Sequence, residues 1–153
     1  MARLAMLLVS LTAVAGWTGP AAAEKRFFTV LAVEPKGGAT VDKESFPPIP
    51  LPSGGGYVMA QADEKTRRWE VSAYVWQPAQ IIVHVGDEVT LEFVGINGTA
   101  HPTSIAGLGV EFTVKRGQAH RVTFVAEKAG AFAITCATHR PSMVGELIVL
   151  AKP

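Results

Sequence analysis

The chain has 153 residues, and its 14 basic side chains nearly balance its 13 acidic ones, which gives a formal net charge of +1 with uncharged histidines. A nearly neutral chain lacks the dense positive charge with which nucleic-acid-binding proteins engage phosphates, so we expect no nucleic acid partner. The length suits one ordinary domain with a hydrophobic core of its own.

Residues 1–23 have the pattern of a secretory signal peptide. A basic start at Arg3 is followed by an apolar run over residues 4–17 and by small residues at 21–23. The run is shorter than the roughly 20 apolar residues that span a bilayer, so we expect cleavage after Ala23 and a periplasmic or secreted protein without a membrane span. The alternative is an uncleaved anchor that holds the domain at a membrane.

Short alternating runs between turn signals predict an all-β protein. Residues 26–34 give a first strand, whereas residues 35–56 are so rich in proline and glycine that we expect a long loop or arm without regular pairing. That segment is either an ordered arm or a disordered linker. A sandwich or barrel is predicted by eight further strand-like runs, at residues 57–61, 67–76, 80–85, 88–95, 110–115, 118–126, 131–136 and 144–150.

Strand alternation sorts the apolar side chains of these runs into faces. Val89, Leu91 and Phe93 share one face, which is typical of a sheet that is wetted on one side only. Trp69 and Trp76 lie an odd number of residues apart within one run, so their side chains fall on opposite faces. We therefore expect at least one of the two tryptophans to face outward or into a subunit contact.

Cys136 is the only cysteine, so it forms no internal disulfide and is buried, intermolecular, reactive or metal-bound. Alternation places it on the inward face beside Ile134, at the end of its strand. His139 and Met143 follow with the spacing Cys-x2-His-x3-Met, and thiolate, imidazole and thioether together suit copper better than hard ions. Zinc is the alternative, although it rarely takes a thioether; Met143 is equally well explained as a gap filler in the core.

A blue-copper site needs a second imidazole. His101 follows a strand and an Asn-Gly turn, and Pro102 restricts its backbone, so we expect a loop histidine suited to be a ligand. His84 lies opposite the apolar residues of its strand and is expected to face solvent. His120 shares a face with two apolar residues and is expected at the rim of the core, as a hydrogen-bonded structural histidine.

Residues 78–150 as a set resemble a cupredoxin. The motifs that carry the resemblance are "VHVGDEVTLEF", "GQAHRVTFVAEKAGAFAITC" and "GELIVL". They resemble most the part of the superfamily that includes nitrosocyanin and the dinuclear copper domains of cytochrome oxidase subunit II and nitrous oxide reductase. The resemblance implies a Greek-key β-sandwich with an N-terminal extension, and the likeness to nitrosocyanin implies that this arm could join subunits into a homo-oligomer. Residues 24–77 would form the arm and the first sandwich strands, and residues 78–153 the copper-binding core, of one domain over residues 24–153.

The resemblance implies His101, Cys136, His139 and Met143 as the ligands of one copper ion per chain. The dinuclear domains carry two cysteines in the ligand loop, so the single Cys136 does not allow a bridged pair of ions here. Nitrosocyanin has a glutamate where this chain has His101. The spacing from His139 to Met143 also departs from familiar blue-copper loops, and without Met143 a water or a backbone carbonyl would take the axial position.

The function expected first is electron transfer by a periplasmic type 1-like copper protein, with His139 as the electron exit and Pro102 and Pro141 in a docking patch for a redox partner protein. The alternative is a nitrosocyanin-like mononuclear copper enzyme or a binder of small molecules such as nitric oxide, which needs an open coordination position. Copper storage is disfavoured because the chain has only four methionines. A domain without metal would leave the lone thiol of Cys136 unexplained.

Overall fold

The structure is a computed structural model that describes residues 23–51 and 54–152. The predicted signal peptide falls almost entirely outside these residues. The regular structure of the described part consists of strands, which form two large sheets and a smaller third sheet. No helix in this part is long and apolar enough to cross a membrane.

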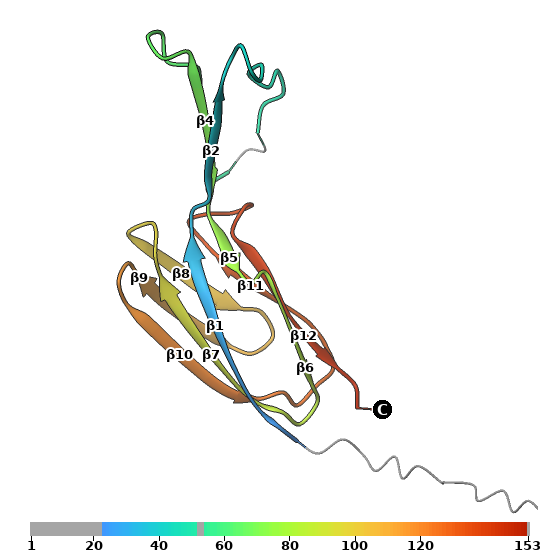
Figure 1. Ribbon diagram of the computed structural model, residues 1–153. Coiled ribbons are helices and arrows are strands. Elements are labelled where there is room, and N and C mark those ends of the chain that lie inside the picture. Colours follow the sequence, from blue (N-terminus) through green and yellow to red (C-terminus); the bar gives the residue numbers. More distant parts are fainter. Residues whose placement is uncertain (1–22, 52–53, 153) are drawn as a thin grey trace, which may run out of the picture.

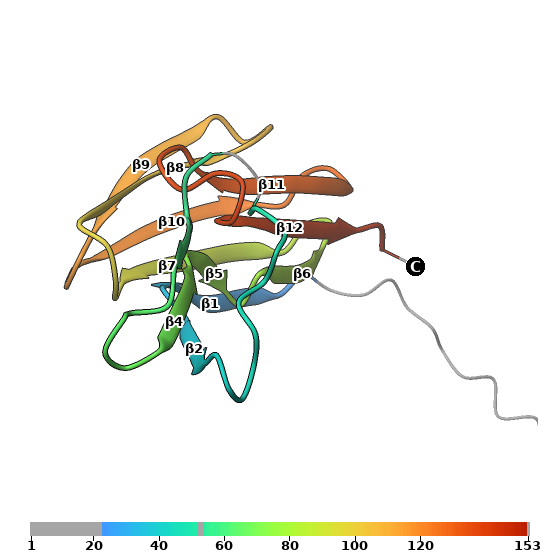
Figure 2. The same ribbon diagram turned by 90° about the horizontal axis from the view of Figure 1, so that it is seen from above.

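The two large sheets pack face to face as a sandwich, which confirms the all-β fold (Figures 1 and 2). The first sheet has the order β10-β7-β1-β5, with β1 at Lys25–Val33, β5 at Val75–Gln77, β7 at Glu88–Gly95 and β10 at Ala119–Val125. The second has the order β6-β12-β11-β8-β9, with β6 at Gln80–His84, β8 at Ala100–Ile105, β9 at Val110–Lys115, β11 at Gly130–Cys136 and β12 at Val144–Leu150.

Alternation along the strands builds the core between the two sheets. Val89, Leu91 and Phe93 of β7 are fully buried, as predicted, and they face apolar side chains of β6 and β12 from the other sheet. Most of β10 alternates between half-buried and exposed residues, because it lies at the edge of its sheet. Pairing within the sandwich is mixed: β1 runs parallel to β7 and β12 parallel to β6, while the other pairs are antiparallel.

The third sheet forms an arm that extends from one end of the sandwich (Figure 1). It has the order β2-β4-β3, with β2 at Lys36–Thr40, β4 at Arg68–Ala73 and β3 at Tyr57–Ala60. The expectation that residues 35–56 pair nowhere is therefore wrong for β2. Gly38 explains why it pairs: a side chain there would overlap the Trp69 carbonyl oxygen, so glycine permits an approach that other residues would block.

The expectation that Trp69 or Trp76 faces outward is also wrong. The predicted run over residues 67–76 is divided at Tyr74 into β4 and β5, which belong to different sheets. Alternation across the division no longer applies, and each tryptophan is buried in its own environment, with 6% of Trp69 and 1% of Trp76 exposed. Trp69 anchors the arm, since its indole Nε1 donates to the Glu44 carbonyl at 2.9 Å and Phe46 packs edge-on against its ring.

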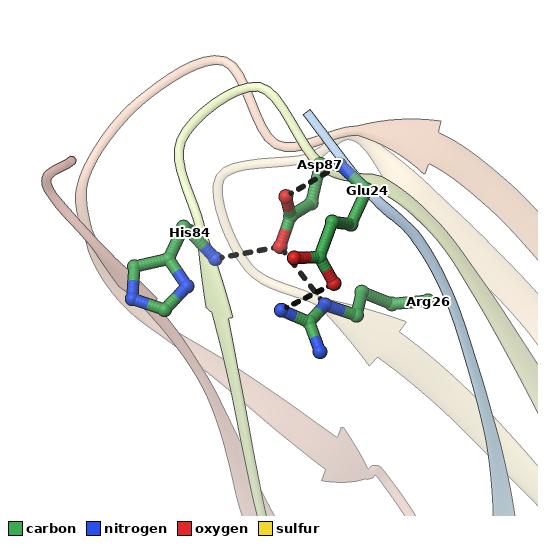
Figure 3. A network of polar contacts seen from close by, with 4 residues as sticks. All are labelled: Glu24, Arg26, His84 and Asp87. Atoms are coloured by element: carbon green, nitrogen blue, oxygen red, sulfur yellow. Dashed lines mark hydrogen bonds and ion pairs between the residues drawn. The ribbon is translucent and has the colours of Figure 1, made fainter. Parts of the chain in front are cut away.

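At the opposite end of the sandwich, the buried carboxylate of Asp87 joins the start of β1 to the turn between β6 and β7 (Figure 3). Its two oxygens accept the backbone N–H groups of Glu24 at 3.1 Å and His84 at 3.0 Å. The Arg26 guanidinium adds a contact at 3.3 Å. These hydrogen bonds, first of all that of His84, hold the pKa of the Asp87 carboxyl below its usual range.

Candidate metal centre

The four predicted ligands meet at the end of the sandwich from which the arm extends. Cys136 is the last residue of β11, and His139 and Met143 lie in the loop that leads from β11 to β12, at the base of the arm (Figure 1). We call residues 136–143 the ligand loop. His101 comes from β8, which pairs with β11 so that Cys136 lies opposite Thr103. The sheet itself therefore brings His101 beside Cys136.

His101 lies in a strand, not in the loop that the sequence predicted. Pro102 suggested a loop because proline removes a donor from a sheet ladder. Pro102 pairs with Thr113 of β9, but pairing between β8 and β11 begins only at Thr103, so on the β11 side Pro102 lies just beyond the ladder. Its carbonyl accepts the N–H of Ala137 at 2.8 Å, which fastens the ligand loop to β8. The proline is accommodated because β11, toward which its carbonyl points, ends there.

Three donor atoms converge at separations that one metal ion can span. The Nδ1 atoms of His101 and His139 are 3.2 Å apart, and the Cys136 sulfur lies 3.4 Å from Nδ1 of His139 and 3.9 Å from Nδ1 of His101. Donors that bind one ion at about 2.0 Å for nitrogen and about 2.3 Å for sulfur lie at such distances from one another. The three residues form a compact group of metal-ligating side chains.

The tautomer of His101 is fixed by its backbone surroundings. Its Nε2 lies 2.7 Å from the Asn97 carbonyl oxygen, which can only accept a hydrogen bond. Nε2 therefore carries the hydrogen, and the lone pair of Nδ1 in the neutral ring points toward Cys136 and His139. Hydrogen bonding of the second ring nitrogen is the usual device by which proteins orient a histidine ligand.

Backbone hydrogen bonds fold the ligand loop so that Met143 returns to Cys136. The Cys136 N–H donates to the Met143 carbonyl at 3.1 Å, and the Met143 N–H donates to the His139 carbonyl at 2.8 Å. The Met143 side chain is fully buried in the same core cluster as Cys136. The loop thus places a thioether beside the three converging donors.

Most of the side chains of the centre are buried. His101, Cys136 and Met143 are fully buried, whereas His139 is half-buried and is the member of the group nearest to solvent. Burial raises the pKa of the Cys136 thiol, against the effect of the nearby backbone N–H groups of His139 and Thr138. Burial and the proximity of His101 lower the pKa of His139. Both shifts favour neutral groups in the apoprotein, so a metal must displace the thiol proton to gain the thiolate.

The other two histidines lie away from the centre. His84 is half-buried at the far end of the sandwich, where its backbone joins the Asp87 network (Figure 3). His120 was expected at the rim of the core, but its ring is exposed and stacks on Phe112 with ring centroids 4.4 Å apart. The edge position of β10 explains the difference, because the face that it shares with Val122 is only partly covered.

Sequence reasoning missed a fifth side chain of the centre. The ring of Tyr74 stacks on the His139 imidazole, with centroids 4.0 Å apart and planes 20° from parallel. Tyr74 lies between β4 and β5, and a tyrosine inside a strand-like run carries no metal-binding signal of its own. Only the division of that run, which aims Tyr74 at the ligand loop, reveals the contact.

The sequence profile of the cupredoxin-like domain family matches residues 54–149. The chain belongs to the cupredoxin-like family. This match confirms the resemblance predicted from the motifs. No curated protein matches this cupredoxin in sequence.

Solved structures with a similar fold include two nitrite reductases and a small copper protein. The copper-containing nitrite reductase of Thermus scotoductus SA-01 gives a TM-score of 0.54 at 18% identity, over 86% of this chain and 28% of the enzyme. The copper nitrite reductase of Nitrosomonas europaea gives 0.52 at 19% identity, over 84% and 42%. Auracyanin A, a "blue" copper protein of Chloroflexus aurantiacus, gives 0.42 at 17% identity, over 50% and 89%. This cupredoxin spans less than half of either nitrite reductase, so the likeness to these two enzymes establishes the fold and not an activity.

Proposed function

We propose that this cupredoxin holds one copper ion with His101, Cys136, His139 and Met143 and serves as an exported electron-transfer protein. The observation that carries the proposal is the uneven burial of the donors. Three of the four side chains are fully buried and only His139 approaches the surface. A redox centre that exchanges electrons with another protein needs such an enclosed metal and one ligand near the surface.

The donor set favours copper over zinc. Two imidazoles and one thiolate also suit zinc, but the buried thioether of Met143 is a poor zinc ligand and a usual weak axial ligand of copper. Bound copper supplies a one-electron couple between Cu(I) and Cu(II). The chain contributes rigid placement of the donors: β8 and β11 hold His101 beside Cys136, and the Asn97 carbonyl keeps the His101 ring in orientation.

Electron exchange would take place at His139. Pro141 in the ligand loop and Pro102 in β8, whose carbonyl accepts a hydrogen bond from that loop, are exposed and offer apolar surface near this histidine. Redox partners usually meet over small and transient interfaces, so a modest apolar patch on a nearly neutral protein suits such a partner. A redox partner protein remains the partner that we propose, with no role for nucleic acid.

The absorption and paramagnetic resonance spectra of the Cu(II)-loaded protein, together with a metal count, test this function. We expect one copper per chain, an intense thiolate band in the red part of the visible spectrum and a small copper hyperfine splitting. The C136S variant should lose the intense band, whereas H84Q should keep it, because His84 lies at the far end of the sandwich. A band at shorter wavelength with a large splitting would instead favour the copper enzyme with an open position, and a protein that binds no copper would overturn both functions.

Export is proposed from the signal-like sequence of residues 1–23. Expression of the full chain in a Gram-negative host should give a periplasmic product whose mass corresponds to a start at Glu24. A product that stays with the membrane fraction at full mass would mean that the segment acts as an anchor.

A further inference from the structure

The arm contacts the candidate metal centre, and we infer that Tyr74 is a positioning residue for the His139 ligand, held in place by the glycine segment Gly54–Gly56. We call this segment the glycine strap. The inference rests on the proposed copper site, but the contacts that support it belong to the chain alone. In this inference, the arm holds the His139 ligand in place and shields it from water.

Tyr74 restricts the orientation of the His139 ring. The phenol ring lies nearly parallel to the imidazole at a centroid distance of 4.0 Å and so covers one face of it. Rotation of the imidazole about the Cβ–Cγ bond of His139 would break this stack. It would also turn Nδ1 away from the Cys136 sulfur, which is 3.4 Å distant. Stacking between aromatic rings is favourable beyond the area that it buries. The contact therefore favours the ring orientation in which Nδ1 faces the other donors.

The glycine strap fixes the backbone of Tyr74. The Tyr74 N–H donates to the Gly56 carbonyl at 2.8 Å. This hydrogen bond lies between β4 and β5, where Tyr74 has left the arm sheet and has not yet joined the sandwich. The Tyr74 ring also packs against the core, with its centroid 5.8 Å from that of the His101 ring, so this hydrogen bond adds a restraint on the Tyr74 backbone.

The strap in turn packs directly on the backbone of the ligand loop. Gly55 forms an isolated bridge with Pro141. A methyl group on Gly55 would overlap the carbonyl oxygen of Thr138, and one on Gly56 would lie 2.5 Å from the carbonyl oxygen of His139. Glycine is required at both positions because main chain packs on main chain, and Gly56 also has a positive φ of 88°.

These contacts have a consequence for the redox properties of the centre. The Tyr74 ring keeps water from one face of the half-buried His139 imidazole. Surroundings of low polarity favour the less charged of two redox states, so the stacked ring should raise the reduction potential. A ligand that is held in one orientation should also make electron exchange faster, because less rearrangement accompanies each transfer.

The first test compares Y74A with Y74F, which keeps the ring and removes only the hydroxyl. We expect Y74F to match the wild type. Y74A should shift the ratio of Cu(I) to Cu(II) affinities toward Cu(II) by about three- to tenfold. A tenfold change corresponds to a potential lower by about 59 mV for a one-electron couple. Y74A should also broaden the Cu(II) resonance spectrum and slow electron self-exchange. A Y74A protein with the potential and spectrum of the wild type would overturn the inference.

The second test acts on the strap and leaves Tyr74 in place. G55A should push the strap away from Thr138 and reproduce the effects of Y74A, while G37A serves as the matched control on the same arm. A methyl group on Gly37 meets only the Val71 side chain, at an ordinary distance of 3.7 Å. If G55A and G37A behave alike, the strap does not position the ligand. This pair also decides the matter should Y74A fail to fold.

The apoprotein separates this inference from the proposed function. The chemical shifts of the His139 ring in NMR spectra of copper-free protein should change in Y74A and G55A but not in Y74F and G37A. If the wild type binds no copper and these shifts still change, the proposed function fails while the positioning of His139 stands. If copper binds and neither the shifts nor the potential change, the inference fails alone.

Discussion

Met143 is the residue whose role the sequence left most open, because its spacing from His139 departs from familiar ligand loops. The structure places its side chain in the core beside Cys136, fully buried. A buried methionine can both fill space and donate a sulfur lone pair, so the two roles must be separated by a substitution that keeps the volume.

The M143L variant separates them. Leucine conserves most of the buried volume, so the free energy of unfolding of the apoprotein should fall by less than about 1.5 kcal/mol. Loss of the thioether should leave the intense visible band and raise the reduction potential, because the thioether stabilises Cu(II) more than Cu(I). M59L, on the arm, is the control. Voltammetry that finds equal potentials in M143L and the wild type would reduce Met143 to a packing residue.

At the scale of single residues, the sequence predicted that His101, Cys136 and His139 would come together, from their residue types and their positions along the chain. It could do so because cysteine and histidine at this spacing are uncommon except where they bind a metal. Tyr74 and the glycine strap carry no such sign. Their roles arise from contacts between segments that are distant in the chain, and no local pattern encodes those contacts.

The arm is an element with an anchor of its own, Trp69. Its indole is 6% exposed, donates to the Glu44 carbonyl and meets Phe46 edge-on. W69A removes a large buried ring and should cost about 3–5 kcal/mol of the stability of the arm. Hydrogen exchange should show loss of protection in β2, β3 and β4.

The control for W69A is I49A, on the same arm, where the side chain is 74% exposed. Substitutions at exposed positions usually change stability by no more than about 0.5 kcal/mol. Exchange rates in the arm that are the same for W69A and I49A would show that Trp69 does not anchor it.

Asp87 joins β1 to the β6–β7 turn, and this connection should depend on pH. The backbone N–H of His84, followed by that of Glu24, holds the pKa of the Asp87 carboxyl below its unfolded value of about 3.9. A lowered folded pKa stabilises the fold above the unfolded pKa, and the stabilisation is lost as pH falls through the folded pKa. D87N should therefore melt at lower temperature than the wild type at pH 7, with a difference that shrinks below about pH 4.

E88Q is the control for D87N, since Glu88 forms only an exposed ion pair with Lys25 at 3.5 Å. Its melting temperature should stay close to that of the wild type at neutral pH. A difference between D87N and the wild type that is the same at pH 3 and pH 7 would contradict the assignment of the effect to the charged carboxylate.

At the scale of elements, alternation predicted the strands of the sandwich and failed where glycine and proline were involved. Composition argued against β2 and against a strand at His101, yet both form. Gly38 is needed for close backbone approach, and Pro102 lies where the pairing with β11 has ended, although β9 still pairs with it. Glycine and proline are unfavourable in an average strand. Whether a particular strand accommodates them depends on the neighbouring strands that the fold places beside it.

Copper binding should stabilise the whole molecule, because the ligands come together only in the folded chain. A ligand that binds the native state alone adds about 2.7 kcal/mol at a free concentration one hundred times its dissociation constant. The melting temperature should rise on addition of Cu(I) or Cu(II) and return after chelation, and C136S should lose most of the rise. Equal melting temperatures for the wild type with and without the metal would mean that the four side chains do not form a site.

The position of β12 has a consequence for when the site can form. An exported chain emerges from the membrane with its N-terminal strands first, yet β12 lies inside its sheet, between β6 and β11. Until Val144–Leu150 has emerged, β6 and β11 have no shared neighbour and keep open hydrogen-bonding edges that invite pairing with other chains. Met143 immediately precedes this last strand, and its carbonyl closes the ligand loop on Cys136. We therefore expect the complete donor set to be among the last parts of the molecule to assemble, so that metal uptake follows the emergence of β12.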